Sequence, residues 1–254
     1  MTAEPAPDPR TADIAANLTA VRRRIAAACA AAGRTGQEPT LVAVTKTFPV
    51  ADVYRLVLLG ARDLGENRDQ EARPKAAQLA ELLAAGSADR ADQPRPRWHF
   101  IGRLQRNKCR AVGGYAAVVH SVDRTELLSP LAAGAAQAGR PAVEVMVQVS
   151  LDGDTSRGGV LPEHVPALAD AVAATDHLTL AGVMAVAPRY ADPDAAFARL
   201  AEVWAAMRAA HPAAVAMSAG MSGDLEAAIR HGATHVRIGT ALLGGRSPAS
   251  GYCP

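Results

Sequence analysis

A lysine with the potential to form a covalent bond stands at the end of the first predicted strand. The run Leu41–Lys46 reads LVAVTK, an apolar stretch whose last side chain carries an amine, and the turn Thr47-Phe48-Pro49 follows it. In parallel α/β folds the carboxyl ends of the strands face the active site. An amine held against apolar groups has a lowered pKa, so Lys46 is a candidate nucleophile towards an aldehyde. The alternative is a lysine that reaches from the strand end into water.

Length, charge and cysteine content narrow the class of protein. The chain has 254 residues, enough for one large α/β domain, and its net charge of +2 comes from basic and acidic residues that are interspersed. We therefore expect no nucleic-acid partner. Cys29, Cys109 and Cys253 form no CxxC or Cys/His cluster, which argues against a disulfide framework and against a metal site. The proline-rich, acidic start and the lack of a long apolar run predict a cytoplasmic protein without a membrane segment.

Short β-branched runs alternate with alanine-rich helical stretches along the whole chain, which is typical of repeated βα units. The predicted strands are Leu41–Lys46, Ala61–Gly65, Trp98–Gly102, Val118–Val122, Val143–Ser150, Leu180–Val186, Ala214–Ser218 and His235–Leu243. The predicted helices are Ala12–Ala32, Val50–Leu59, Arg68–Ala85, Gln105–Val112, Arg124–Ala138, Pro162–Ala174, Pro193–Ala210 and Gly223–His231. Eight strands are the number that closes a barrel, so we expect a single TIM-type (β/α)8 barrel; an open doubly wound sheet gives a similar pattern.

The same pattern sets the expected domain boundaries. We expect a flexible N-terminal tail over residues 1–11, the barrel over 12–245 and a C-terminal tail over 246–254. The helix before the first strand could cover the side of the barrel where a helix after the last strand is missing. The segment Gly86–Arg97 has the composition of an exposed loop.

Polar and glycine residues gather after the last two predicted strands. Ser222 precedes a predicted helix, and Gly239 and Thr240 follow Arg237 near a strand end. Backbone N–H groups at a helix start and in a glycine turn bind anions, and barrels often bind phosphate after strands seven and eight. Ser222, Gly239 and Thr240 are therefore assigned to a phosphate, with ordinary loop and capping roles as the alternative. Arg237 should point into the barrel mouth, where its charge needs a partner.

An aldehyde-reactive lysine, a phosphate site and an inward arginine match pyridoxal 5′-phosphate (PLP). Its aldehyde would react with Lys46, its phosphate would bind after the last two strands, and its ring nitrogen would accept a hydrogen bond from Arg237. A permanently charged donor keeps that nitrogen unprotonated. An unprotonated ring withdraws electrons weakly, so this site is biased against broad carbanion chemistry.

Seven blocks of the chain resemble one known family, the pyridoxal phosphate homeostasis proteins. They are LVAVTKTFP at 41–49, LGENRDQE at 64–71, WHFIGRLQRNK at 98–108, HSVD at 120–123, GVMAVAP at 182–188, SAGMSGDLEAAIRHG at 218–232 and VRIGTALLGGR at 236–246. The resemblance implies the alanine racemase N-terminal barrel, with Lys46 as the cofactor lysine, Arg237 at the pyridine nitrogen, Ser222, Gly239 and Thr240 at the phosphate, and Asn67 in the pocket. Arg157, Arg103 and Gly223 depart from the usual family residues.

The resemblance also implies a role without dedicated catalysis. The protein would hold PLP as a Lys46 Schiff base and buffer or deliver it, with apo-PLP enzymes as recipients and a monomer as the expected state. One alternative is a PLP-dependent amino-acid racemase; the similar alanine racemases use a tyrosine from an additional C-terminal domain, where this chain has only Tyr252 in a short tail. A second is a barrel enzyme that forms its Schiff base directly with a substrate, as aldolases do.

A few further residues invite assignment. His99 and His120 lie in predicted strands without a second ligand at metal spacing, and we expect Trp98 and Phe100 in the core. The Cys109 thiol is expected to be inert, although a basic loop precedes it. The basic residues Arg103, Arg106 and Lys108 are expected to be solvated, with an anionic partner as the alternative.

Overall fold

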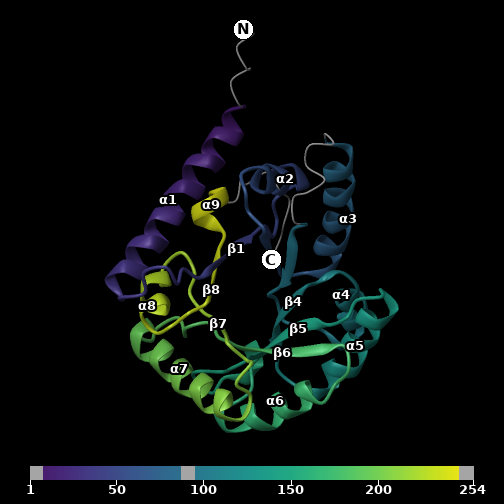
Figure 1. Cartoon of the computed structure of the whole chain (residues 1–254), viewed down its shortest axis with the longest axis vertical. Coiled ribbons are helices and arrows are strands. Elements are labelled where there is room, and N and C mark those ends of the chain that lie inside the picture. Colours follow the sequence, from purple (N-terminus) through teal and green to yellow (C-terminus); the bar gives the residue numbers. More distant parts are fainter. Residues whose placement is uncertain (1–7, 87–94, 246–254) are drawn as a thin grey trace.

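The structure is a computed structural model that describes residues 8–86 and 95–245. Within these residues, eight parallel strands close into a barrel in chain order, β1 to β8, and β8 pairs with β1 (Figure 1). The predicted barrel is confirmed, and the open doubly wound sheet is excluded because β1 and β8 are hydrogen-bonded neighbours. The barrel brings every strand's carboxyl end to one face.

The strands are β1 (Thr40–Val44), β2 (Asp63–Glu66), β3 (Arg97–Phe100), β4 (Val118–Val122), β5 (Val143–Gln148), β6 (Leu178–Met184), β7 (Ala216–Ser218) and β8 (His235–Ile238). The helices are α1 (Pro9–Ala31), α2 (Val50–Leu58), α3 (Asp69–Ala85), α4 (Cys109–Tyr115), α5 (Leu128–Gln137), α6 (Val165–Ala173), α7 (Pro193–Ala210), α8 (Leu225–Arg230) and α9 (Thr240–Leu243). Short 3-10 turns precede α4, α5 and α6.

Alternation along the strands divides the barrel into an outer apolar layer and a partly polar interior. Ala43, Leu64 and Val236 point outward and pack with buried residues of the surrounding helices. The barrel interior holds an apolar cluster that includes Met146 and Met184. Burying the outer layer between strands and helices supplies most of the hydrophobic stabilisation, which leaves the interior free to hold polar groups.

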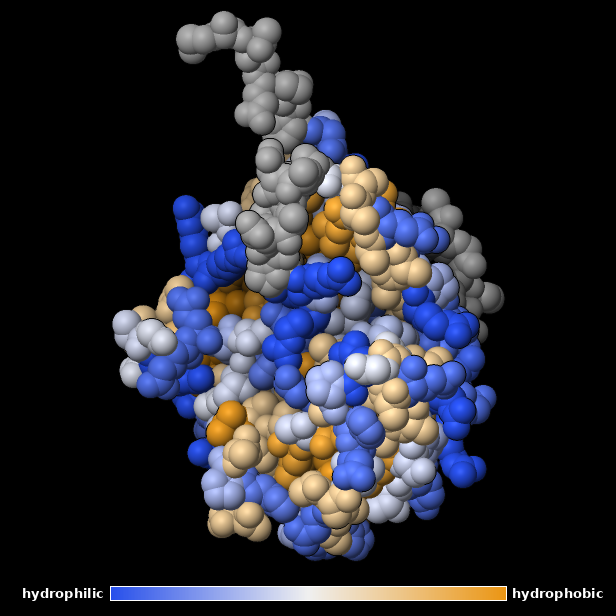
Figure 2. Space-filling model, turned by 45° about the vertical axis from the view of Figure 1, so that its right-hand side comes forward, coloured by the Kyte–Doolittle hydropathy of each residue, from blue (hydrophilic) through white to orange (hydrophobic). Residues whose placement is uncertain are grey.

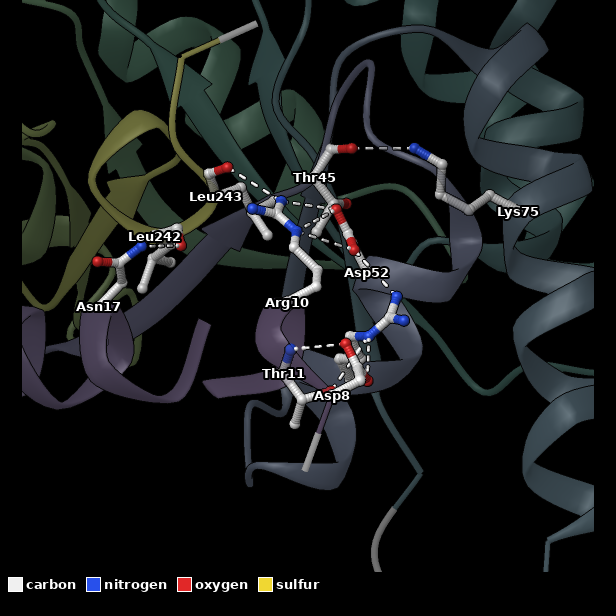
Figure 3. Close-up of polar contacts among 10 residues, drawn as sticks. Asp8, Arg10, Thr11, Asn17, Thr45, Asp52, Lys75, Leu242 and Leu243 are labelled. Atoms are coloured by element: carbon white, nitrogen blue, oxygen red, sulfur yellow. Dashed lines mark hydrogen bonds and ion pairs between the residues drawn. The ribbon is translucent and has the colours of Figure 1, made fainter. Parts of the chain in front are cut away.

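The N-terminal helix α1 completes the outer ring of helices. It contacts α8, α9 and α2, and Figure 3 shows how it is fixed. Arg10 donates from Nη2 to the Asp52 carboxylate of α2 at 2.7 Å and to the Leu243 carbonyl of α9 at 3.0 Å. Asn17 donates to the Leu242 carbonyl at 3.0 Å. The expectation that this helix covers the side next to the last strand is confirmed.

Most element boundaries differ from those expected by a few residues, and three of these differences concern the site or the N-terminal helix. β1 ends at Val44 rather than Lys46, and β8 ends at Ile238 rather than Leu243 because residues Thr240–Leu243 form α9. A helix therefore does follow the last strand, but it has only four residues. α1 starts at Pro9, inside the expected tail, since the Asp8 side chain caps its first turn.

Some expectations fall outside the described residues. These are the tails at 1–7 and 246–254, which include Tyr252 and Cys253, and most of the predicted loop, residues 87–94. Trp98 and Phe100 are buried, as expected. In the described residues, no helix combines the length and apolar character needed to cross a bilayer. Figure 2 shows hydrophilic and hydrophobic residues interspersed over the face in view.

Candidate functional site

A cavity of about 450 Å³ opens where β1, β2 and β8 end. Its wall includes Lys46, Asn67, Gly239 and Thr240, four of the six residues assigned to the cofactor from the sequence. Ser222 and Arg237 do not line it. A larger hollow of about 760 Å³ lies against α2 and α3 on the outside of the barrel, and none of the six residues lines it. The cavity at the strand ends is therefore the candidate site.

Lys46 lies in a four-residue turn directly after β1. Phe48 N–H donates to the Thr45 carbonyl at 3.1 Å, and Thr47, between them, has a φ of 69°. That left-handed conformation is unfavourable for a β-branched residue. The turn is held by Glu71 of α3, whose carboxylate accepts from Thr47 N–H at 3.1 Å. Lys46 itself is exposed, so the expectation of an amine pressed against apolar groups is wrong.

A buried ion pair holds the start of the same turn. Lys75 of α3 donates to Glu66 at 2.6 Å and to the Thr45 carbonyl at 3.0 Å, and the Thr45 hydroxyl donates to the same Glu66 oxygen at 2.7 Å. The Lys75–Thr45 contact is drawn in Figure 3. Burial raises the pKa of the Glu66 carboxyl although Lys75 opposes the shift. The sequence did not indicate this role of Lys75, because helix periodicity does not show which groups the end of a long side chain contacts.

Asn67 reaches the cavity because the next loop contains glycine. A Cβ atom at Gly102 would lie 2.1 Å from the Asn67 carbonyl oxygen, so only glycine permits the two loops to approach so closely. The side-chain oxygen Oδ1 of Asn67 is buried and has no hydrogen-bond partner within the described residues. Buried polar atoms in native proteins are normally satisfied. An unpaired oxygen at the cavity wall fits a site that is completed by a ligand.

The wall formed after β8 offers groups suited to an anion. Gly239 approaches β1 closely, since a Cβ atom there would lie 3.3 Å from the Val44 carbonyl oxygen, and α9 starts at Thr240. Within the described residues, the N–H groups of Thr240 and Ala241 have no carbonyl acceptor, whereas those of Leu242 and Leu243 donate to the Gly239 carbonyl at 2.9 and 3.0 Å. Ser222 lies apart from this wall, and its carbonyl accepts from Arg24 at 2.7 Å.

Arg237 is buried inside the barrel, on the side that strand alternation predicts, but it does not line the cavity at the mouth, into which it was expected to point. Its side chain donates to the Ser218 hydroxyl at 2.6 Å and to the Ala185 carbonyl at 2.9 Å. Burial lowers the pKa of the guanidinium to about 10, so Arg237 remains charged at neutral pH. Neither direct partner is an acid, but the Asp224 carboxylate acts on the guanidinium through space and opposes the lowering of its pKa.

The remaining sequence assignments can also be placed. Burial raises the pKa of the Cys109 thiol to about 11, which agrees with the inert role expected. Arg103 donates to the Ser156 carbonyl at 2.8 Å and Lys108 lies 3.9 Å from Asp69, so two residues of the basic loop have partners within the protein. Among the described residues, no group of three His, Cys, Asp or Glu side chains is arranged to hold a metal ion.

Comparison with known proteins first defines the class. The family model for the alanine racemase N-terminal domain matches residues 16–247. Alanine racemase from Corynebacterium glutamicum is similar in fold, with a TM-score of 0.63 at 17% identity over 96% of this chain and 63% of its own. The barrel fold is that of this class of domain.

Individual relatives are more similar. The pyridoxal phosphate homeostasis protein of Mycobacterium tuberculosis is 45% identical, covering 93% of this chain and 94% of its own, and that of Escherichia coli is 37% identical, covering 92% and 97%. A solved structure of PipY from Synechococcus elongatus with PLP bound superposes with a TM-score of 0.75 at 30% identity, covering 91% of this chain and all of that one. The chain belongs to the family of pyridoxal phosphate homeostasis proteins.

Proposed function

We propose that this protein binds PLP covalently at Lys46 and maintains the cellular supply of the cofactor without dedicated catalysis. The observation that carries the proposal is the cavity that joins Lys46 to Asn67, Gly239 and Thr240. Its volume of about 450 Å³ falls in the range of small-molecule sites, roughly 300–1,000 Å³. The relatives named for PLP homeostasis and the PLP-bound PipY structure support the same ligand.

The lysine assignment rests on a comparison within the chain. There are three lysines, Lys46, Lys75 and Lys108. Lys75 is buried in its ion pair with Glu66, and Lys108 lies near Asp69, whereas Lys46 lines the cavity and is exposed to an incoming aldehyde. In the proposed reaction the Lys46 nitrogen bonds to the aldehyde carbon and the carbonyl oxygen leaves as water.

The other residues of the site would position the cofactor. We assign Gly239 and Thr240 to the phosphate, together with Ser222, which does not line the cavity, and the Asn67 side-chain oxygen to a polar group of the cofactor. Arg237, beneath the mouth, is assigned to the ring nitrogen. PLP supplies an electrophilic aldehyde and an aromatic ring, and a charged arginine at that ring favours storage of the cofactor over carbanion chemistry.

Cofactor delivery completes the proposal. We infer that apo-PLP enzymes in the cytoplasm receive the cofactor and that the carrier works as a monomer. The alternative, an amino-acid racemase, requires a second base facing Lys46. The described tyrosines lie elsewhere: Tyr54 and Tyr115 pack against the outer core, and Tyr190 is 95% exposed. Incubation of the loaded protein with single-enantiomer amino acids tests this alternative, because loss of optical activity would establish a racemase.

The covalent bond is tested by exchanging lysines one at a time. Lys46→Ala should abolish the visible absorbance of bound PLP and the mass adduct left by borohydride reduction, with an unchanged thermal unfolding midpoint because Lys46 is exposed. Lys108→Ala is the matched control and should keep the full adduct. An adduct that persists in Lys46→Ala would place the reactive amine at another lysine and contradict the proposal.

A further inference from the structure

A chain of hydrogen bonds crosses the barrel interior below the proposed cofactor site. It starts at Asp63 on β2, whose carboxylate lies 2.8 Å from His99 Nε2. His99 Nδ1 lies 2.8 Å from His120 Nε2, and His120 Nδ1 lies 2.9 Å from the Ser218 hydroxyl. Arg237 closes the chain by donating to the same hydroxyl at 2.6 Å. Besides Arg237 on β8, the strands β2, β3, β4 and β7 thus contribute one side chain each.

The two ends of the chain determine which atoms carry the hydrogens. Arginine can only donate and an ionised carboxylate can only accept. With neutral histidines, the Ser218 hydroxyl accepts from Arg237 and donates to His120 Nδ1, and His120 Nε2–H donates to His99 Nδ1. His99 Nε2–H then donates to Asp63. Every donor therefore points from the buried guanidinium towards the carboxylate, and the bond dipoles add.

Burial and the surrounding charges favour the neutral form of His120 in this arrangement. His99, His120, Ser218 and Arg237 are at most 5% exposed. Burial, followed by the neighbouring His99 and Arg237, lowers the pKa of His120 well below its ordinary value. Burial would raise the pKa of Asp63, but the His99 hydrogen bond and nearby positive groups outweigh it and leave the pKa lowered. Arg237 and Asp63 thus lie at opposite ends of a chain formed by His99, His120 and Ser218.

Further titratable and charged groups face the chain, among them Asp224, whose carboxylate opposes the lowering of the Arg237 pKa. The His235 ring centroid lies 6.1 Å from that of His99 and 6.2 Å from that of His120. Arg97 lies 3.8 Å from the Asp63 carboxylate and donates to Glu144 at 2.7 Å. Asp63 is 15% exposed in its side chain, so the chain links the partly solvated end of the barrel to the base of the mouth.

We propose that Asp63, His99, His120 and Ser218 form a directional relay that positions Arg237 and offsets its charge. The relay thereby sets how strongly Arg237 donates to the cofactor ring. These four are positioning residues, since they act through Arg237. The role at the ring rests on the proposed function, whereas the relay itself is a property of the cofactor-free protein and can be tested without PLP.

The first test determines which ring nitrogens of His99 and His120 carry a hydrogen. Long-range ¹H–¹⁵N NMR spectra of the cofactor-free protein, labelled in histidine, should show His99 and His120 protonated at Nε2 and unprotonated at Nδ1 at neutral pH. Ser218→Ala removes the hydroxyl that donates to His120 and should shift the His120 Nδ1 resonance. The control Ser121→Ala removes a neighbouring buried hydroxyl that has no partner in the described residues and should leave the His120 resonances in place.

The second test reads the effect on the cofactor. Ser218→Ala should weaken PLP binding about tenfold, as expected for loss of a hydrogen bond to a charged group, and shift the visible absorbance maximum of the bound cofactor. Asp63→Asn, at a partly solvated position, keeps an acceptor for His99 but removes the charge, and should give the same shift with a smaller loss of affinity. Ser121→Ala should match the unaltered protein in both respects.

The outcomes separate the relay from the function. Unchanged His120 resonances in Ser218→Ala, or a different tautomer in the unaltered protein, would overturn the relay. Shifted resonances with unchanged affinity and absorbance would overturn its action on the cofactor. A failure of the unaltered protein to form any lysine adduct would contradict the proposed function alone, because the NMR result stands without PLP.

Discussion

At the scale of single residues, accessibility distinguishes Lys46 from the other lysines. Lys75 and Lys108 are engaged with carboxylates, whereas Lys46 is exposed on the cavity wall. Gly239, on the same wall, approaches β1 so closely that a Cβ atom would lie 3.3 Å from the Val44 side chain and carbonyl. The amine proposed to react and the wall proposed to bind the anion thus share one cavity, because Lys46 is exposed and Gly239 has no side chain.

The phosphate assignment makes a prediction about two hydroxyls. Thr240→Val should weaken binding of PLP about tenfold, because a charged acceptor loses a donor, and should change binding of pyridoxal, which lacks the phosphate, far less. Ser222→Ala should add a smaller loss, since Ser222 does not line the cavity. Titrations of both vitamers provide the measurement, with the helix-surface variant Thr19→Val as control. Equal losses for PLP and pyridoxal would remove these residues from the phosphate site.

At the scale of elements, α3 holds the turn that presents Lys46. Glu71 and Lys75 lie on the same face of this helix and bond to the Thr47 N–H and the Thr45 carbonyl, on either side of Lys46. The left-handed φ of Thr47 is therefore maintained by two contacts from one rigid element. We interpret α3 as the element that sets the position of the amine.

This arrangement predicts that stability and cofactor affinity can be separated. Lys75→Met leaves the Glu66 carboxylate buried without its partner and should lower the free energy of unfolding by roughly 3–5 kcal/mol. Adding Glu66→Leu should recover most of that loss, because neither charge is then buried. PLP affinity should stay reduced in the double variant, since the Thr45 carbonyl still lacks Lys75. Denaturant unfolding and PLP titration measure the two effects, and full recovery of affinity would show that the turn does not depend on Lys75.

At the scale of the whole molecule, polar groups inside the barrel link stability to pH. Burial, followed by the nearby His99, lowers the pKa of His235 to about 4. Its ordinary value in an unfolded chain is about 6.5, so between these values the unfolded chain binds the proton more readily. The contribution of neutral His235 to the free energy of unfolding is thus complete above about pH 6.5. It is lost as the pH falls towards 4.

The pH dependence can be assigned by mutation. His235→Asn should flatten the decline in unfolding free energy between about pH 6.5 and 4, a difference of roughly 3 kcal/mol over the full range. The exposed His164 provides the control, because His164→Gln should leave the slope as it is. Denaturant melts at a series of pH values make the comparison. Buried His120, whose pKa is also lowered, should leave part of the slope in place, so a decline as steep as that of the unaltered protein would show that His235 does not contribute.

The order of strands and helices was determined by the sequence alone. Period-two and helical patterns identify eight strands, and β4 and α7 begin and end where predicted. The short motifs around Lys46, Asn67, Gly239 and Thr240 indicated residues that the structure places on one cavity wall. Such features are local, because each depends on neighbours within a few positions of the chain.

Only the tertiary structure decided which residues far apart in the chain contact one another. Lys75 meets Thr45 across 30 positions, and Ser218 meets His120 across 98. The four-residue helix α9 was missed because its apolar sequence also suits a strand, and α1 fixes it from the other end of the chain. Polar contacts of this kind depend on the distance between side-chain atoms in the folded protein. The periodicity of the sequence does not indicate that distance.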